Sequence, residues 1–308
     1  MAQAADPVRS GIPDVVVAGS AARDIDATDP RGWRLGGGVT YGALACARLG
    51  IRTGVLVGVD TVASTAWELD LLLDAGVELI RVELPSGPVF HNQERREGRI
   101  QTSIDPGTPM PVDGIPAAWR EAPAWILAPV ASELPDVWAA QPAATTQVAF
   151  AWQGILRRLV AGERVTPLVP GPSALLARAD IVGVSVNDLG SGPAWPDIMA
   201  WLRPTVEVLL TAGVHGGLLL QRGSGGGVSG RRFPPVPARV ELDATGAGDS
   251  TLAALVCARV AGAPGAGRRG RDLMLAATVG SLIVEGPGLD AVPTLAAVRR
   301  RLDLGRAA

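Results

Sequence analysis

Short apolar runs that favour strands alternate with longer segments that favour helices along most of this chain. The strand-like runs are rich in β-branched and aliphatic residues and cover residues 14–18, 53–57, 124–127, 147–150, 181–184 and 206–210. The helix-like segments cover about residues 39–49, 61–75, 132–140, 153–161 and 195–203. Strands that alternate with helices form βαβ units and pair in parallel. The sequence therefore predicts an α/β fold with a doubly wound, mostly parallel sheet flanked by helices.

Residues 78–104 break this alternation, because strand-like runs follow one another there with only turn signals between them. Together with the segment 21–36, they predict a small antiparallel sheet that projects from the main domain. A small sheet beside an α/β core is suited to act as a lid over a site. Residues 1–13 resemble a flexible arm, so we expect one domain over residues 14–308 that includes this lid.

The last fifth of the chain favours helices, from about residue 246 to residue 303. Residues 252–260 and 273–284 are apolar nearly all round, so these two helices are expected to be buried. The final helix, 294–302, carries a run of arginines near its carboxyl end, where positive charge suits the helix dipole.

The composition excludes several kinds of function. The chain contains no lysine, which rules out a Walker-type P-loop and a Schiff base on a lysine side chain. The two cysteines, Cys46 and Cys257, lie in apolar segments and match neither a zinc site nor a disulfide framework. The formal net charge is −2 and no basic stripe is present, so no nucleic-acid partner is expected. No signal peptide or membrane-spanning run is evident, which predicts a cytoplasmic protein without a membrane partner.

The most informative string is Asp243-Ala-Thr-Gly-Ala-Gly-Asp249, which leads directly into an apolar helix. The first turn of a helix leaves backbone N–H groups without internal partners, and these form an anion site at the positive end of the dipole. Glycines there allow close approach of a ligand. Asp249 lies in the same turn, where the N–H dipoles favour its ionised form, and an ionised carboxylate can accept a proton from an attacking alcohol. The alternative is an ordinary helix start, capped by Asp243 or Thr245.

This string resembles the signature of the PfkB/ribokinase family of carbohydrate kinases. The resemblance implies that Gly246, Ala247 and Gly248 form the anion hole for the transferred phosphoryl group. It further implies that Asp249 is the catalytic base, that ATP is the phosphoryl donor and that Mg²⁺ shares the charge. The likeness covers nearly the whole chain, from about residue 14 to residue 302.

The acceptor side of such a site is also recognisable. Gly36-Gly37-Gly38 precedes a helix, and in the family position this implies that Gly36 and Gly37 border the sugar pocket. Asp24 matches a family aspartate that binds substrate hydroxyls, a role for which a carboxylate is well suited. Asn92, on a predicted lid strand, is a second candidate for a substrate hydroxyl. Tyr41 stands where the family often has asparagine, so it is expected to face the substrate.

The donor side is matched less completely. Thr211-Ala-Gly213, followed by Gly216, resembles the family's nucleotide-binding segment, and Thr245 is also expected to face the donor. Residues 278–286 lie where the family borders the adenine. Asn187 matches the start of an Asn-x-x-Glu motif that organises magnesium and phosphates, but Gly190 stands at the Glu position. The metal ligands therefore stay unassigned, with Asp188 as a substitute at a different spacing.

Three functions stay open at this point. Gln153-Gly-x-x-Arg157 and residues 127–133 are similar to an inositol-kinase-like branch, which favours a sugar or cyclitol acceptor. A nucleoside kinase of the same superfamily is the first alternative, with Tyr41 or Phe90 as a platform for the base. A non-catalytic sensor of nucleotide or polyol is the second, favoured by the departures at Ala22, Tyr41 and Gly190. Lids in this family sometimes pair between subunits, so a homodimer through the lid also stays open.

Overall fold

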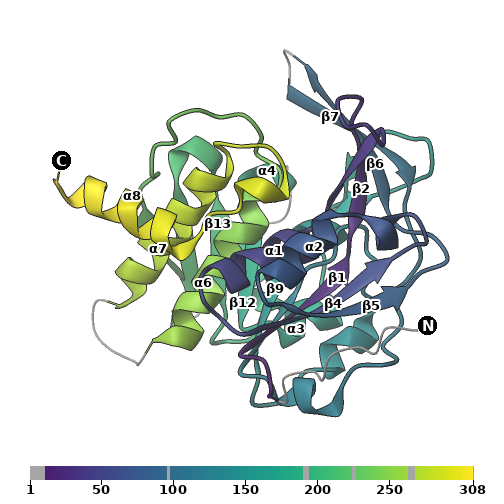
Figure 1. Ribbon diagram of the computed structural model, residues 1–308. Coiled ribbons are helices and arrows are strands. Elements are labelled where there is room, and N and C mark those ends of the chain that lie inside the picture. The colour runs from purple at the N-terminus through teal and green to yellow at the C-terminus, as the bar shows by residue number, and fades with distance from the viewer. Residues whose placement is uncertain (1–10, 96–97, 190–193, 224–226, 263–267, 308) are drawn as a thin grey trace.

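The computed structural model describes residues 11–95, 98–189, 194–223, 227–262 and 268–307 (Figure 1). Most of the arm expected at residues 1–13 lies outside the described residues. None of the described helices is both long enough and apolar enough to cross a membrane.

A nine-stranded sheet forms the centre of the molecule. Seven of its strands are parallel to their neighbours, and the last two, β14 and β15, run antiparallel at one edge. This arrangement confirms the predicted α/β class. In spatial order, the strands are β15 (Val228–Phe233), β14 (Gly217–Arg222), β13 (Glu207–Thr211), β12 (Ile181–Ser185), β9 (Gln147–Ala151), β8 (Ala124–Leu127), β1 (Val15–Ser20), β4 (Thr53–Val59) and β5 (Glu78–Glu83).

Alternate residues of the central strands bury into two separate cores, one on each face of the sheet. Val15 and Val17 of β1 belong to one core, and Val16 belongs to the other. The first core packs under the long helices α1 (Gly38–Arg48), α2 (Glu68–Asp74), α6 (Ala247–Ala261), α7 (Arg268–Ile283) and α8 (Leu295–Ala307). The second core lies under shorter elements, which include α3 (Ala174–Arg178) and α5 (Trp195–Ala200), and contains four buried tryptophans, Trp119, Trp125, Trp138 and Trp152.

A second, four-stranded sheet projects beyond one end of the main sheet (Figure 1). Its order is β3 (Trp33–Gly36), β2 (Ala22–Ile25), β6 (Val89–Arg95) and β7 (Gly98–Asp105). The prediction that all of residues 78–104 belong to this sheet is wrong for residues 78–83, because they form the edge strand β5 of the main sheet. The small sheet is also not wholly antiparallel, since β2 and β6 run parallel.

Three predicted helices differ in the structure. The segment 61–75 is divided into a 3-10 turn (Ala63–Thr65) and α2. The segment 132–140 contains a 3-10 turn at Asp136–Ala140 in place of an α-helix. The segment 153–161 is a 3-10 turn at Trp152–Ile155, followed by the short strand β10 (Arg157–Arg158), which pairs with β11 (Thr166–Pro167).

Candidate active site

A cavity of about 970 Å³ opens at the carboxyl ends of β9, β12 and β13, between the small sheet and the start of α6. Open α/β sheets bind ligands at this edge. Most of the residues selected from the sequence line it: Asp24, Gly37, Tyr41, Asn187, Thr211, Gly213, Gly216, Thr245, Gly246, Ala247, Gly248 and Asp249. The fold therefore brings residues from both halves of the chain to one site.

The amino end of α6 borders the middle of this cavity. Gly246 is the N-cap residue in the left-handed region (φ 75°), and no side chain among the described residues caps the helix. A Cβ added to Gly248 would meet nothing within 4 Å, so the backbone is open to the cavity there. Asp243 is not the cap, because its carboxylate accepts hydrogen bonds from the N–H groups of Thr245 (2.9 Å) and Gly288 (3.3 Å). The helix therefore presents backbone N–H groups to a ligand.

Asp249 lies deep in the cavity against the start of α1. A Cβ at Gly38 would stand 2.6 Å from Asp249 Oδ1, so only glycine at position 38 leaves room for this carboxylate. Burial raises the pKa of Asp249 to about 6, opposed by the charge of Arg157 and assisted by that of Asp188. The N–H dipoles at the helix start predicted an ionised carboxylate, and desolvation raises its pKa without neutralising it at pH 7. Asp249 is thus mostly ionised at neutral pH, with a pKa suited to a general base.

The ring of Tyr41 lies next to both Gly36, at the end of β3, and Gly246, at the start of α6. The ring packs so closely on Gly246 that a Cβ there would be 2.3 Å from it. The ring also lies 3.8 Å from the Cβ position of Gly36, and the side chain is 2% exposed. Tyr41 therefore forms a wall of the cavity and supports the turn that begins α6.

A hydrogen-bonded chain from the small sheet ends at Asp24. Gln101 Nε2 donates to Asn92 Oδ1 (2.8 Å), and Asn92 Nδ2 donates to Asp24 Oδ1 (2.7 Å). Gly36 backs the same carboxylate, since a Cβ there would be 2.8 Å from Asp24 Oδ2. Asn92 and Gly36 are not among the residues that line the cavity, but both contact Asp24, which is. The side-chain amide of Asn92, itself held by Gln101, thus fixes the orientation of the Asp24 carboxylate at the cavity wall.

The chain matches no family model, and no curated protein matches its sequence. Its backbone, in contrast, superposes on many solved structures. Arabidopsis thaliana ribokinase, solved with ribose and ATP, is 20% identical with a TM-score of 0.67, over 95% of this chain and 99% of that one. A pyrophosphate-dependent kinase in the ribokinase family, solved with a pyrophosphate analogue and myo-inositol, is 19% identical with a TM-score of 0.68, over 95% and 99%. The nucleoside kinase of Methanocaldococcus jannaschii is 14% identical with a TM-score of 0.66, over 96% and 100%.

This chain has the ribokinase fold. The fold predicted from the sequence resemblance is therefore confirmed.

At the far end of the cavity, the walls of this ribokinase fold become apolar. Thr211, Gly213 and Gly216 follow β13, and Gly213 (φ 52°) and Gly216 (φ 81°) both take positive φ angles that favour glycine. The apolar side chains in this part of the wall are Val214, Val236, Val240, Ala277 and Val284, and the carboxylate of Glu241 follows Val240 in the same lining. Part of the predicted adenine border, 278–286, lies here, since Gly280 and Ser281 also line the cavity.

The lining residues that were not selected as site residues from the sequence include Gly38, Gln153, Arg157 and Asp188. Gln153 Nε2 donates to Asp188 Oδ1 (2.9 Å), which places that carboxylate at the cavity wall. The glycine triplet 36–38, the motif Gln153-Gly-x-x-Arg157 and the Asp beside Asn187 were visible in the sequence, but the roles of these residues depend on the fold.

Within the described ranges, no group of three or more His, Cys, Asp or Glu residues could hold a metal ion by itself. Gly190, at the usual Glu position, lies outside the described residues.

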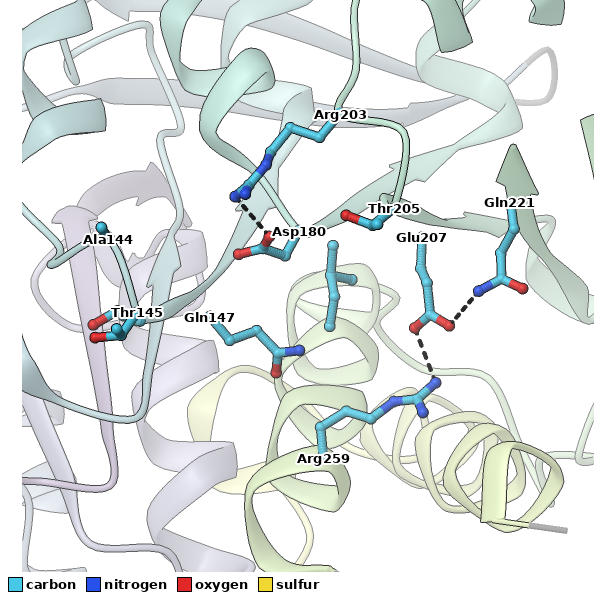
Figure 2. A pocket seen from close by; sticks show the side chains of 11 residues that line it. Ala144, Thr145, Gln147, Asp180, Arg203, Thr205, Glu207, Gln221 and Arg259 are labelled. Carbon is cyan, nitrogen blue, oxygen red and sulfur yellow. Dashed lines mark hydrogen bonds and ion pairs between the residues drawn. The ribbon is translucent and has the colours of Figure 1, made fainter. Parts of the chain in front are cut away.

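A second cavity, of about 420 Å³, lies at the opposite ends of the same elements (Figure 2). Its charged residues pair with one another: Arg203 with Asp180 (2.9 Å) and Arg259 with Glu207 (3.0 Å). Arg259 lies near the carboxyl end of α6, and Asp249 lies near the amino end. None of the residues selected from the sequence lines this second cavity.

Proposed function

We propose that this protein is an ATP-dependent kinase that transfers the γ-phosphoryl group to a hydroxyl of a sugar or cyclitol. One observation carries the proposal. A half-buried carboxylate, Asp249, stands in the first turn of a helix whose N–H groups face a cavity and have no side-chain cap among the described residues. A base beside an anion site is the combination that phosphoryl transfer to an alcohol requires.

The acceptor hydroxyl lies between Asp249 and the open turn of α6. Asp249 accepts its proton, the acceptor oxygen bonds to the γ-phosphorus and the bond from that phosphorus to the β-phosphate oxygen breaks, which releases ADP. The N–H groups at Gly246–Gly248 stabilise the charge on the transferring group. Gly38 supports this step because its missing side chain leaves room for the base.

The donor is a nucleotide because the far end of the cavity is apolar. Val214, Val236 and Val284 offer contact to a base, and pyrophosphate has no group that would use such a surface. Similar folds have been solved with ATP in Arabidopsis ribokinase and with ADP in Cryptococcus neoformans ribokinase. The pyrophosphate-dependent neighbour makes pyrophosphate the donor to test against ATP.

Mg²⁺ accompanies the donor phosphates in this proposal. The ion keeps several waters and usually takes one or two carboxylates in addition to the phosphates, so a full protein cage is not required. Asp188 and Asn187 both line the cavity and offer the oxygen ligands that Mg²⁺ prefers. The ion supplies charge neutralisation at the phosphates.

The acceptor side favours a polyol. Asp24, oriented by Asn92, presents a carboxylate that accepts hydrogen bonds from hydroxyls. Tyr41 and Phe90 also line the cavity, but they are 2% and 1% exposed and are packed into its wall. A nucleoside acceptor, for which such rings would be a platform, is therefore the second candidate.

The test is product formation from defined donors and acceptors. Purified protein is incubated with Mg-ATP or Mg-pyrophosphate and with separate inositols, pentoses, hexoses, hexose phosphates and nucleosides. Release of ADP or phosphate is followed, and the product is identified by ³¹P NMR. The proposal predicts an ATP-dependent product with a sugar or cyclitol. A product with nucleosides alone would select the second candidate, whereas ligand binding without any product would favour a sensor.

A further inference from the structure

The charges around the candidate active site are unbalanced. Among the described residues that line the cavity, Arg157 is the only one with a cationic side chain. Four carboxylates line the same space: Asp24, Asp188, Glu241 and Asp249. A donor that carries several phosphate charges needs compensation there, and the chain has no lysine to provide it.

The backbone that carries Arg157 is held closely against the loop that follows β8. A Cβ at Gly154 would be 2.1 Å from the carbonyl oxygen of Pro129, so this turn depends on glycine for its approach. Ser132 Oγ donates to the carbonyl oxygen of Gly154 at 3.0 Å. The loop itself is fixed by the buried carboxylate of Glu133, which accepts hydrogen bonds from the N–H groups of Ala131 (2.7 Å) and Ser20 (2.8 Å).

The residues after the turn are fixed as well. Arg157 pairs with Pro167 and Arg158 pairs with Thr166 in the β10–β11 ribbon. The N–H of Leu168 donates to the carbonyl oxygen of Leu156 at 2.8 Å. Adjacent residues of a strand point to opposite sides, so Arg157 faces the cavity while Arg158 is exposed and pairs with Glu163 at 3.5 Å.

The geometry points to Arg157 as a catalytic residue that binds the donor phosphates and the transferring phosphoryl group. This assignment rests on the proposed kinase function. It adds the guanidinium of Arg157 to the helix N–H groups and Mg²⁺ as a third group that binds phosphate oxygens. Guanidinium presents a planar set of donors that matches two phosphate oxygens at once. The charge of Arg157 also lowers the pKa of Asp249 against the effect of burial, which indicates that the two groups act across the same space.

In the reaction, Arg157 neither gains nor loses a proton. The acceptor oxygen bonds to the γ-phosphorus, the bond to the β-phosphate oxygen breaks, and the acceptor proton moves to Asp249. Arg157 donates hydrogen bonds to phosphate oxygens whose charge is redistributed as the group moves. Arginines in such positions accelerate phosphoryl transfer by about 10³–10⁵-fold in GTPases.

The first test compares ligands with and without phosphates. Binding of ATP, ADP, pyrophosphate and adenosine is measured by calorimetry for wild type, Arg157→Gln and Arg158→Gln. Arg158→Gln is the matched control, because it removes the same charge from the adjacent residue outside the cavity. We expect Arg157→Gln to weaken the phosphate-bearing ligands by at least about 10-fold, with adenosine changed by less than about 2-fold. Equal losses for ATP and adenosine, or no loss for any phosphate, would overturn the assignment.

The second test measures turnover with the acceptor identified for wild type. Arg157→Gln is expected to lose at least about 10²-fold in kcat, Arg157→Lys to recover part of it, and Arg158→Gln to stay within about 2-fold. Added guanidinium should raise the rate of Arg157→Gly and not that of wild type. Turnover of Arg157→Gln within about 3-fold of wild type would contradict the role.

The two proposals fail in different ways. If wild type binds ATP but phosphorylates no acceptor, the kinase proposal fails, and the binding ratio between ATP and adenosine still decides the phosphate-binding role of Arg157. If Arg157→Gln does not fold, as judged by its thermal transition, Arg157→Lys replaces it. Lysine keeps the charge but loses the planar fork, so ATP binding is then expected to fall by about 3- to 10-fold relative to adenosine.

Discussion

The carboxylate of Asp249 lies against the backbone of Gly38, so that a Cβ at position 38 would stand 2.6 Å from Oδ1. These residues begin two different helices, α6 and α1, which pack side by side over the same face of the main sheet (Figure 1). The candidate base is thus positioned by the contact between two helix starts. Asp24 approaches from the small sheet and Arg157 from strand β10.

Substitution of Gly38 should remove activity without unfolding the protein. In Gly38→Ala, the new methyl group occupies the place of the Asp249 carboxylate, which must shift, and misplacement of about 1 Å costs about 10²-fold in rate. Steady-state kinetics measures the loss of rate, and circular dichroism checks that the variant is folded. Gly42→Ala is the matched control in the same helix, because its Cβ would meet Val17 at an ordinary 3.5 Å. Similar rates for both variants would show that the Gly38 contact does not position the base.

The pH dependence should report the raised pKa of Asp249. The base must be deprotonated to act, so kcat/KM is expected to fall as pH decreases through about 6, the pKa of the buried carboxyl. Arg157 lowers this pKa, so the same limb should move to higher pH in Arg157→Gln. A profile of kcat/KM between pH 4.5 and 9 tests both. A rate that stays constant down to pH 4.5 is inconsistent with Asp249 as the base.

Asp24 is expected to determine acceptor affinity. Asp24→Asn keeps the size of the side chain but removes the charge that accepts hydrogen bonds from hydroxyls, so the acceptor KM should rise by about 10- to 100-fold. The affinity for ATP should change little, because Asp24 lies on the small sheet. Asp26→Asn serves as the control, since Asp26 pairs with Arg34 and Thr28 outside the cavity. An unchanged acceptor KM in Asp24→Asn would move the hydroxyl-binding role elsewhere.

Glu133 should contribute to stability through its buried hydrogen bonds. Its carboxylate accepts from the N–H groups of Ser20, Val130 and Ala131, and alanine would leave these buried donors unsatisfied. The free energy of unfolding of Glu133→Ala should fall by at least about 3 kcal/mol, measured by urea denaturation. Glu121→Ala, at an exposed position, should change it by less than about 0.5 kcal/mol. A loss below about 1 kcal/mol at Glu133 would mean that water replaces its contacts.

The parallel sheet and the helix start at Asp249 could be predicted because both leave local patterns. Buried parallel strands are continuous apolar runs, and the Gly-Ala-Gly turn needs its residues in one short string. β5 was placed in the wrong sheet because it is an edge strand, and its mixture of polar and apolar residues is also typical of a small solvated sheet. Residues 153–161 have a helical composition, but the approach of Gly154 to Pro129 is a tertiary contact that the local sequence does not encode.

The features of the site that the sequence did not predict also depend on tertiary contacts. The motif that contains Arg157 was visible, yet its place in the cavity depends on the pairing of β10 with β11. Local sequence shows the helix dipole and not the extent of burial, so it predicts that Asp249 is ionised but not that its pKa is raised. Gly38 was overlooked beside Gly36 and Gly37, because the neighbour that requires glycine there is more than two hundred residues away in the chain.

The most direct test of the central claim is the rate of ADP formation by Asp249→Asn relative to wild type, at pH 8 with Mg-ATP and the identified acceptor. The exposed Asp197, in the first turn of α5, provides the matched control Asp197→Asn. Burial raises the pKa of Asp249 from 3.8 to about 6, so folding disfavours its ionised form, and this unfavourable contribution develops between these two pH values and is complete above them. Asp249→Asn should therefore be no less stable than wild type. We predict a loss of at least about 10²-fold in kcat for Asp249→Asn and less than about 2-fold for Asp197→Asn; near-normal turnover of a folded Asp249→Asn protein would contradict the account.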